Sequence, residues 1–575
     1  QYLNKFFWKY RLRLIFGIIF IIISNVFALY PAEFVREAFD TVLEEKKQIS
    51  SDISSVLLKY GFLIALFAIM KGVFMFFMRQ TIIVMSRKIE FDLKNEIYNQ
   101  YQSLSMSFYK KNKTGDLMNR ISEDVSRVRM YLGPALMYGI NILILFYLVI
   151  SKMLTISITL TSYVLLPLPL LAILVYFVSS SINKRSEQVQ EQLSQTTTIA
   201  QESFSAIQII KSFRNEINTF KVFLESCKKY TYKQIKLVKI EAIFFPLIIT
   251  MIGMSTILTI YIGGIESYKG NITTGNIAEF IIYVNMLAWP VASVGWITSI
   301  VQRAAASQER INNFLLIESE IKNNNTGFTK VDGDIHFNNV SLTYKDTKIN
   351  ALMDVSFTIK KGSSIGIFGK TGSGKSTIAN LICRLYDTNK GNIKFDKTDI
   401  KDLNLFMLRS SIGYIPQDDY LFSGSIKQNI AFTSDKIDES KILEAARKAR
   451  ILKEINNFND GFDTVIGERG VKLSGGQRQR LAIARTFYKN PDLFIFDDSL
   501  SAVDSIKEQE ILKNLNKETH SKTTIIISNR ISTIKNTDYI IVLSKGKIIE
   551  QGTHESLLKN KGLYYKTNTS QSDCI

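Results

Sequence analysis

Six long stretches with little or no charge constrain this sequence most. No charged residue lies between Leu14 and Ala32, and about 20 such residues in a helix span a hydrocarbon core of roughly 30 Å. A soluble helical core would need charged faces every few residues. A signal peptide would have a shorter apolar run and a small-residue cleavage site. The sequence therefore predicts six membrane-spanning helices, at about 14–32, 56–78, 132–151, 155–178, 242–265 and 280–302.

A few residues within these spans bear on how the helices are connected, what they face and where they bend. Only Lys152 separates the third span from the fourth, which predicts a helical hairpin with a very short loop. Lys59 and Lys71 of the second span are costly in lipid, so they face an aqueous cavity, pair internally or reach the membrane surface. Aromatic side chains could line a cavity or simply pack between helices: Phe74, Phe76, Phe77, Tyr283, Trp289 and Trp296. Pro246 and Pro290 could kink spans five and six.

The basic residues are unevenly distributed between the two sides of this bundle. The chain has a net charge of +19, and residues 79–129 and 184–241, which follow spans two and four, each hold ten Lys or Arg. The connection after the first span is short and acidic. Because Lys- and Arg-rich connections stay in the cytoplasm, the N-terminus, both long connections and the part after span six are predicted to be cytoplasmic. Membrane topology thus accounts for the basic excess, and no nucleic-acid partner is expected.

The two long basic connections are predicted to be helical. Unstructured loops of this length are uncommon, and apolar residues recur at three- and four-residue steps between Ile199 and Phe213. The membrane helices should therefore continue into the cytoplasm, and short crossing helices should lie near 109–116 and 206–216. A charged, solvated face without further function is the alternative.

The composition changes after Phe314. Residues 323–327 (Asn-Asn-Asn-Thr-Gly) are polar and turn-prone, and from Val331 short β-rich runs alternate with helical patterns. The predicted organisation is an all-α transmembrane domain over 1–315, a linker over 316–330 and an α/β domain over 331–575.

A phosphate-binding loop lies near the start of the α/β domain. The apolar run Ser364–Phe368 leads into Gly-Lys-Thr-Gly-Ser-Gly-Lys-Ser-Thr, and a helical pattern follows. In this strand–loop–helix context, glycines let backbone N–H groups reach phosphate oxygens, Lys375 reaches the β- and γ-phosphates, and Ser376 binds Mg²⁺. The residues of this loop that are predicted to bind nucleotide phosphates are Gly369, Lys370, Thr371, Gly372, Ser373, Gly374, Lys375, Ser376 and Thr377.

Two further motifs accompany the loop. The apolar run Leu493–Phe496 ends in Asp497 and Asp498, and a carboxylate at the end of a buried strand beside a phosphate loop suits a magnesium site. The turn Leu473, Ser474, Gly475, Gly476 and Gln477 opens an Arg-rich helix. It either caps that helix or binds an anion, which would then belong to another chain's nucleotide.

With these motifs the sequence resembles the ATP-binding cassette (ABC) exporters over essentially its whole length. Six spans and one nucleotide domain correspond to a half-transporter. The resemblance implies ATP and Mg²⁺ as cofactors, a second half-transporter as partner, and shared sites in which the signature 473–477 completes the partner's ATP site. It also implies an adenine-stacking residue, a magnesium-associated glutamine, a segment facing the crossing helices and a D-loop: Tyr344, Gln417, Gly467–Gly470, and Ser501 with Asp504.

Two catalytic positions depart from the family pattern. The family has Glu after the magnesium-associated Asp, and this chain has Asp498; the family has His after the last core strand, and this chain has Asn529. Asp places its carboxylate one methylene further back, and Asn cannot exchange a proton near neutral pH. Both changes predict a degenerate site that binds ATP and hydrolyses it poorly, whereas the signature is intact.

The resemblance is to bacterial heterodimeric multidrug-type exporters. It implies a multi-pass protein of the cytoplasmic membrane that exports hydrophobic or amphipathic compounds, in contact with lipids, as half of a heterodimer. A slow homodimer, a lipid flippase, a peptide exporter, and a nucleotide-gated channel or regulatory subunit are the alternatives.

Overall fold

A computed structural model describes residues 2–45, 53–328, 331, 333–434, 436–467, 470, 472–499, 505–518 and 522–572. The chain divides into two compact units. The first comprises Gln1–Tyr101 and Gly115–Ile317, and the second comprises Gln102–Thr114 and Glu318–Ile575.

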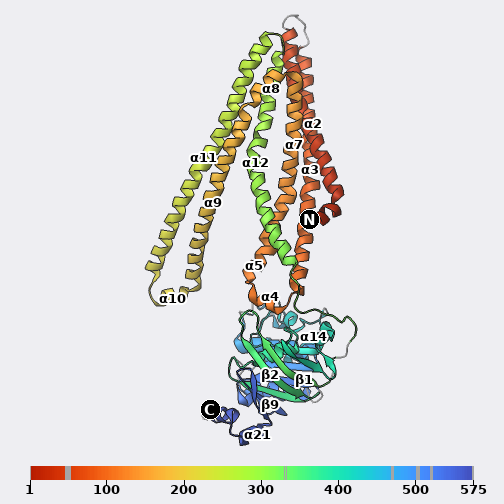
Figure 1. Cartoon of the computed structure of the whole chain (residues 1–575), viewed down its shortest axis with the longest axis vertical. Helices are drawn as coiled ribbons and strands as arrows, with labels where there is room; N and C mark the ends of the chain where they lie inside the picture. The colour runs from red at the N-terminus through yellow and green to blue at the C-terminus, as the bar shows by residue number, and fades with distance from the viewer. Residues whose placement is uncertain are drawn as a thin grey trace. The chain divides into compact units, whose positions relative to one another are not determined.

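The first unit is helical (Figure 1). Among the described residues, six helical stretches are long and apolar enough to cross a membrane. They are built from α2 (Arg11–Glu45), α3 (Ile53–Ser103), α5 (Thr114–Asn119) through α7 (Leu136–Ile156), α8 (Ile158–Leu165) with α9 (Pro167–Ser205), α11 (Glu216–Tyr268) and α12 (Thr274–Leu315). A short helix, α1 (Asn4–Lys9), precedes them. The helices extend beyond the apolar stretches, as the periodicity of the long connections predicts.

The turn between the third and fourth membrane stretches differs from the expectation. Lys152 lies inside α7, and the break comes five residues later at Ser157, whose backbone is extended and whose hydroxyl accepts a hydrogen bond from the N–H of Leu160 at 3.2 Å. A single charge at a helix end does not stop a helix, whereas a serine N-cap starts the next one. Lys152 instead forms an ion pair with Glu33 of α2.

The third membrane stretch contains two π-helical turns, η1 (Arg120–Asp124) and η2 (Tyr131–Ala135), separated by α6 (Val125–Met130). Pro134 lies inside η2. Proline has no N–H to donate and crowds the carbonyl of the preceding turn, so widening the turn lets the helix continue past it.

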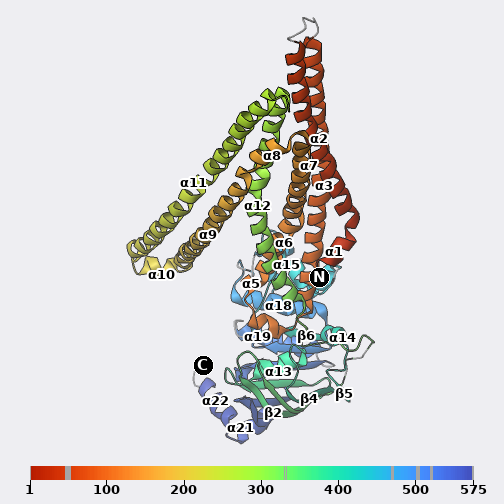
Figure 2. The same cartoon turned by 45° about the horizontal axis from the view of Figure 1, so that its top comes forward.

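Two antiparallel helices form an arm of the first unit. Helices α9 and α11 lie side by side in both views and are joined by the short helix α10 (Ile207–Ser212) (Figures 1 and 2). Ser226 of α11 is buried between them and is bonded to Thr196 of α9 at 2.8 Å. Helix α10 lies within the range predicted for the second crossing helix. The first crossing helix, α4 (Met106–Lys111), begins three residues earlier than predicted and belongs to the second unit.

The second unit is an α/β domain. Its described residues form a mixed six-stranded sheet in the order β10-β9-β3-β8-β7-β6 and an antiparallel four-stranded sheet in the order β2-β1-β4-β5. In the six-stranded sheet only the β10/β9 pair is antiparallel. The strands are β1 (Ile335–Thr343), β2 (Asn350–Ile359), β3 (Ser364–Gly369), β4 (Lys390–Phe395), β5 (Thr398–Asp399), β6 (Ile412–Ile415), β7 (Leu493–Asp497), β8 (Thr523–Ser528), β9 (Tyr539–Ser544) and β10 (Lys547–Gly552).

Among the described residues of this unit, three apolar cores are formed. One lies between the two sheets and includes α13 (Lys375–Ile382); the second joins β6 and β7 to a helical part; the third covers another part of the large sheet. The remaining helices are α14 (Leu405–Ser411), α15 (Ile426–Ile430), α16 (Glu439–Lys448), α17 (Leu452–Ile455), η3 (Gly461–Asp463), α18 (Gly475–Lys489), α19 (Ser505–Glu518), α20 (Ile531–Ile534), α21 (His554–Lys559) and α22 (Leu563–Ser572).

The polar stretch predicted as a linker is bound to the α/β unit. Asn325 donates a hydrogen bond to the carbonyl oxygen of Asp402 at 3.1 Å, and Asn404 donates one to the carbonyl oxygen of Gly327 at 2.9 Å. The side-chain oxygen of Asn323 accepts from the N–H of Leu405 at 2.9 Å. Asparagines are turn-prone, and their amides also bond to main-chain groups of a neighbouring element.

Candidate functional site

The phosphate loop follows β3, which pairs with β8 on one side and with β9 on the other. At the start of α13, Gly374 has φ +102°, and a Cβ there would lie 2.4 Å from the carbonyl oxygen of Ala351. Gly372 has φ +79° with open space around it. The tight turn therefore needs glycine at 374 for two reasons, backbone conformation and close packing.

Lys375 is buried at the centre of the loop. Its Nζ donates to the carbonyl oxygens of Gly369 and Lys370, at 2.8 and 3.1 Å. Burial lowers the pKa of Lys375, and the carboxylates of Asp498 and Asp497 oppose this shift. The loop carbonyls are neutral partners, so the charge of the ammonium remains available to a polyphosphate.

A buried hydroxyl in the loop also suits a phosphate. Ser373 Oγ has no hydrogen-bond partner among the described residues and almost no access to water. A buried hydroxyl without a partner costs free energy, and a phosphate oxygen would accept its hydrogen bond. Together with Lys375 and the N-terminus of α13, this fits the loop to the phosphates of ATP.

A carboxylate and a hydroxyl meet beside the loop. Ser376 Oγ donates to Asp497 Oδ1 at 2.9 Å, and the hydroxyl of Tyr414 donates to Asp497 Oδ2 at 3.2 Å. Burial raises the pKa of Asp497, and the two hydrogen bonds oppose that rise. Hard oxygen ligands of this kind fit Mg²⁺, which would offset the negative charge of the nucleotide's phosphates. Ser376 would bind the ion, and Asp497 would support Ser376 through their hydrogen bond.

Tyr414 is a site residue that the sequence analysis missed. It supplies the polar side chain of β6, and it lies opposite Ile495 in the ladder with β7. The signal was a hydroxyl in an otherwise apolar strand, but only the pairing of β6 with β7 brings it to Asp497.

The two departing residues lie at the ends of neighbouring parallel strands. Asp498 follows β7, is half-buried with φ +48°, and its N–H donates to the carbonyl oxygen of Ile527 in β8 at 2.9 Å. Asn529 follows β8 and is exposed; its carbonyl oxygen accepts from Gln571 at 2.9 Å. The negative charge of Asp498 opposes the lowering of the pKa of Lys375, so Asp498 acts electrostatically on the phosphate loop.

Tyr344 and Gln417 come from two other strands. Tyr344 follows β1, and its hydroxyl lies 3.1 Å from Thr377 Oγ1 in α13. Gln417 follows β6, and its side chain is exposed. The structure thus brings Tyr344 to the phosphate loop and leaves Gln417 beyond the end of the strand that pairs with β7.

The signature residues form the beginning of α18. Ser474 is the N-cap: its hydroxyl accepts from the N–H of Gln477 at 3.3 Å, and Gln477 Oε1 accepts from the N–H of Ser474 at 2.9 Å. Leu473 is buried in the second apolar core, the one that joins β6 and β7 to a helical part of the domain. Among the described residues, no hydrogen bond or ion pair joins the turn 473–477 to the chain's own phosphate loop, 369–377. Ser474 therefore caps α18, and anion binding by Ser474, Gly475 and Gly476 stays a prediction.

Some predicted residues lie outside the described residues. These are the D-loop residues Ser501 and Asp504, and Glu468 with Arg469 in the segment predicted to face the crossing helices. Gly467 and Gly470 are described, with φ +76° and +67°.

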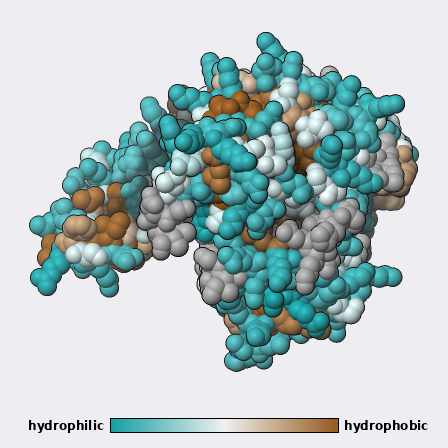
Figure 3. Space-filling view, turned by 90° about the horizontal axis from the view of Figure 1, so that it is seen from below, coloured by the Kyte–Doolittle hydropathy of each residue, from teal (hydrophilic) through white to brown (hydrophobic). Residues whose placement is uncertain are grey.

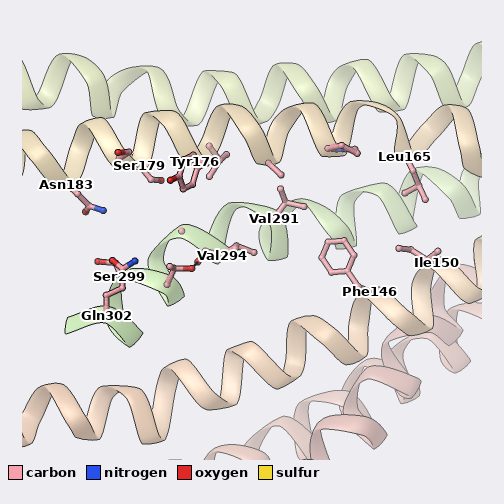
Figure 4. Close-up of a pocket in the computed structure, with 16 residues that line it drawn as sticks. Phe146, Ile150, Leu165, Tyr176, Ser179, Asn183, Val291, Val294, Ser299 and Gln302 are labelled. Atoms are coloured by element: carbon pink, nitrogen blue, oxygen red, sulfur yellow. Dashed lines mark hydrogen bonds between the residues drawn. The ribbon is translucent and has the colours of Figure 1, made fainter. Parts of the chain in front are cut away.

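The membrane unit contains a cavity of about 540 Å³ lined by α7, α8, α9 and α12 (Figure 4). Phe146, Ile150 and Leu165 lie toward one end, and Asn183, Ser299 and Gln302 lie toward the other. Among the residues whose side chains the structure describes, those of the lining are all uncharged: Phe146, Ile150, Leu165, Pro169, Ala172, Val175, Tyr176, Ser179, Ser180, Asn183, Val291, Val294, Gly295, Thr298, Ser299 and Gln302. The cavity is therefore amphipathic and suits an uncharged or weakly polar molecule.

The membrane residues singled out from the sequence do not line this cavity. Lys59 and Lys71 are exposed on α3. Phe74 and Phe77 pack against Phe20 of α2, with ring centroids 6.1 and 5.6 Å apart, which favours the helix-packing interpretation. Three others lie elsewhere: Tyr283 is buried and bonded to Glu279, Trp289 is 73% exposed, and Trp296 packs on Tyr138.

Known proteins match both halves of the chain. Residues 14–291 match the ABC transporter transmembrane region, and residues 352–501 match the ABC transporter family. A relative from Bacillus subtilis (strain 168), the probable multidrug resistance ABC transporter ATP-binding/permease protein YheI, is 33% identical over 98% of this chain and 96% of its own length. The ATP-dependent lipid A-core flippase of Syntrophus aciditrophicus (strain SB) is 32% identical over 88% of this chain and 84% of its own.

A solved structure extends the similarity to the fold. The structure of a bacterial Atm1-family ABC exporter with ATP bound has a TM-score of 0.81 and 25% sequence identity, and the match covers 98% of each chain. The chain, with its six membrane helices and its α/β ATPase domain, belongs to the ABC transporter family.

Proposed function

We propose that this chain is one half of a heterodimeric ABC exporter and carries the degenerate ATP site of the pair. The observation that carries the proposal is the double departure, Asp498 and Asn529, in a site whose phosphate loop is intact. Asp in place of Glu withdraws the carboxylate by about one methylene, and a misplacement of about 1 Å can cost roughly 10²-fold in rate. Asn529 can bind a phosphate oxygen but cannot exchange a proton.

Under this proposal the site residues have the following roles. Residues 369–377 bind ATP, Tyr344 stacks on adenine, and Ser376, Gln417 and Asp497 hold Mg²⁺. Asp498 and Asn529 support only weak hydrolysis. Residues 473–477 complete the competent site of the partner, with Ser501 and Asp504 in the D-loop. The domains are 1–315 (transmembrane), 316–330 (linker) and 331–575 (nucleotide-binding).

An apolar surface at the end of the α9–α11 arm supports the proposal that this chain binds a partner chain. Phe204, Phe213 and Ile217 are 76%, 78% and 74% exposed around α10. The patch appears brown at the left of Figure 3. These residues belong to a basic connection, where exposed phenylalanines are costly in water and are usually covered by another protein surface.

The amphipathic cavity supports the proposal that the substrates are hydrophobic or amphipathic compounds. It has room for a small organic molecule, and its polar end offers uncharged hydrogen-bonding groups. The flippase among the relatives makes lipid transport the second candidate. The excess of Lys and Arg in residues 79–129 and 184–241 supports a cytoplasmic position for these segments and for the ATPase domain.

The test is the ATPase rate of the purified chain, alone and together with a half-transporter that co-purifies with it from native membranes. The chain alone should hydrolyse ATP at a rate near background, and the pair should be far faster. Brisk hydrolysis by the single species, abolished by Asp498→Asn, would contradict the heterodimer proposal. ATP-dependent uptake into inside-out vesicles against a gradient would separate an exporter from a channel.

A further inference from the structure

A lysine of the first crossing helix lies on the tyrosine assigned to adenine. Helix α4 belongs to the same compact unit as the α/β domain. Lys110 Nζ lies 4.7 Å from the ring centroid of Tyr344 and 5.5 Å from that of Tyr386. The two rings meet edge to face, 5.1 Å apart at 84°. The ammonium thus occupies the angle between two rings, within the distance typical of cation–π attraction.

A second contact anchors the same helix beside the same tyrosine. Ser107 of α4 donates to Glu320 Oε2 at 2.8 Å, and Lys345 donates to Glu320 Oε1 at 2.8 Å. Lys345 follows Tyr344 directly in the sequence. Helix α4 is therefore tied both to the ring of Tyr344 and, through Glu320, to the residue next to it.

Tyr344 is in contact with the core of the α/β domain. The residue is half-buried and packs against the core between the two sheets, while its hydroxyl lies 3.1 Å from Thr377 Oγ1. Lys110 is exposed, so it approaches the ring from the solvent side. A purine base that stacks on this solvent-facing side of the tyrosine meets Lys110.

We propose that Lys110 and the purine base of the nucleotide compete for Tyr344. This inference rests on the proposed ATP site. Base stacking on an aromatic ring is worth about 5- to 100-fold in affinity, and an exposed cation–π contact is worth about 2- to 5-fold. The base therefore displaces Lys110, and nucleotide binding weakens the hold of the α/β domain on α4. By reciprocity, releasing Lys110 strengthens nucleotide binding by the same factor.

The experiment measures equilibrium binding of ATP and of inorganic tripolyphosphate, which has no base, to the full-length chain in nanodiscs. Lys110→Met keeps the length of the side chain and removes its charge. It should tighten ATP binding about 2- to 5-fold and leave tripolyphosphate binding unchanged. Lys110→Arg keeps a cation over the ring and should behave like the wild type. The neighbouring residue Lys111 is also exposed, and Lys111→Met should change neither the affinity for ATP nor that for tripolyphosphate.

Three results would overturn the competition: unchanged ATP affinity in Lys110→Met, weaker ATP binding, or equal tightening of ATP and tripolyphosphate. Weaker ATP binding would mean that Lys110 holds the base, and equal tightening would mean a general charge effect on phosphates. If the wild-type chain binds no ATP at all, the proposed function itself fails. If ATP binds normally and Lys110→Met has no effect, only the competition fails.

Discussion

Two neighbouring carboxylates differ in environment because β7 ends between them. Asp497 is the last residue of the strand and is buried, with hydrogen bonds from Ser376 and Tyr414. Asp498 is the first residue beyond it, with φ +48°, and is half-buried. The sequence alone predicted both roles from the resemblance. The hydrogen bond from Tyr414 depends on strand pairing and could not be predicted.

Restoring both family residues should raise the ATPase rate. The double variant Asp498→Glu with Asn529→His moves the carboxylate forward and supplies a group that exchanges protons, so hydrolysis by the chain should rise at least about tenfold. Steady-state phosphate release measures this. ATP affinity should stay close to that of the wild type, because Lys375 and Ser376 are unchanged. A rate that stays flat would show that these two positions do not limit hydrolysis.

Asp419 should make stability depend on pH. Burial raises the pKa of this carboxyl to about 7, against the opposing charges of Arg485 and Arg478, and its Oδ1 has no partner among the described residues. Between about pH 4 and pH 7 the folded chain therefore binds more protons than the unfolded chain. The free energy of unfolding falls as pH rises through this window and levels off above it.

Removing the carboxyl tests this dependence. Asp419→Asn should raise the free energy of unfolding of the α/β domain by about 1–3 kcal/mol above neutral pH, with a smaller gain at about pH 5. Calorimetric melting of the full chain at both pH values measures the difference. Asp460→Asn, in an exposed residue that is not among the groups shifting the pKa of Asp419, is the control. A gain that does not change with pH would contradict the assignment.

At the scale of elements, helices were predictable and their ends less so. Long uncharged stretches and periodic connections predicted the membrane helices, because burial in lipid and helical repetition are both encoded locally. The turn at Ser157 and the beginning of α4 at Met106 were missed. Caps and tertiary contacts decide where a helix ends, and a charge such as Lys152 does not.

The phosphate loop gives a matched pair of glycine variants. Gly374→Ala should abolish ATP binding, because its Cβ would lie 2.4 Å from the carbonyl oxygen of Ala351 and φ is +102°. Gly372→Ala also strains the backbone, with φ +79°, but its Cβ meets nothing within 4 Å. It should therefore weaken ATP binding only several-fold, which titration with a fluorescent ATP analogue measures. Equal losses in both variants would show that packing against Ala351 is not what matters.

At the scale of the whole molecule, charge predicts orientation. We expect a cysteine at Lys269, in the short connection between α11 and α12, to be labelled from outside by a membrane-impermeant maleimide. A cysteine at Lys211 in α10 should react only after permeabilisation. Each of the two cysteines is introduced singly into a variant in which Cys227 and Cys574 have been replaced by serine (Cys227→Ser, Cys574→Ser). Cys383 can remain, because burial raises its pKa to about 12 and so leaves little reactive thiolate. Labelling with the opposite sidedness would reverse the topology.

The sequence by itself determined the six apolar helices, the phosphate loop and the two departures from the family pattern, because hydrophobic length, glycine spacing and residue identity are local properties. The tertiary structure decided which distant residues meet: Tyr414 with Asp497, and Lys110 with Tyr344. It also formed the amphipathic cavity lined by α7, α8, α9 and α12. These contacts depend on strand order and helix packing, which bring together residues far apart in the chain and leave no pattern along it.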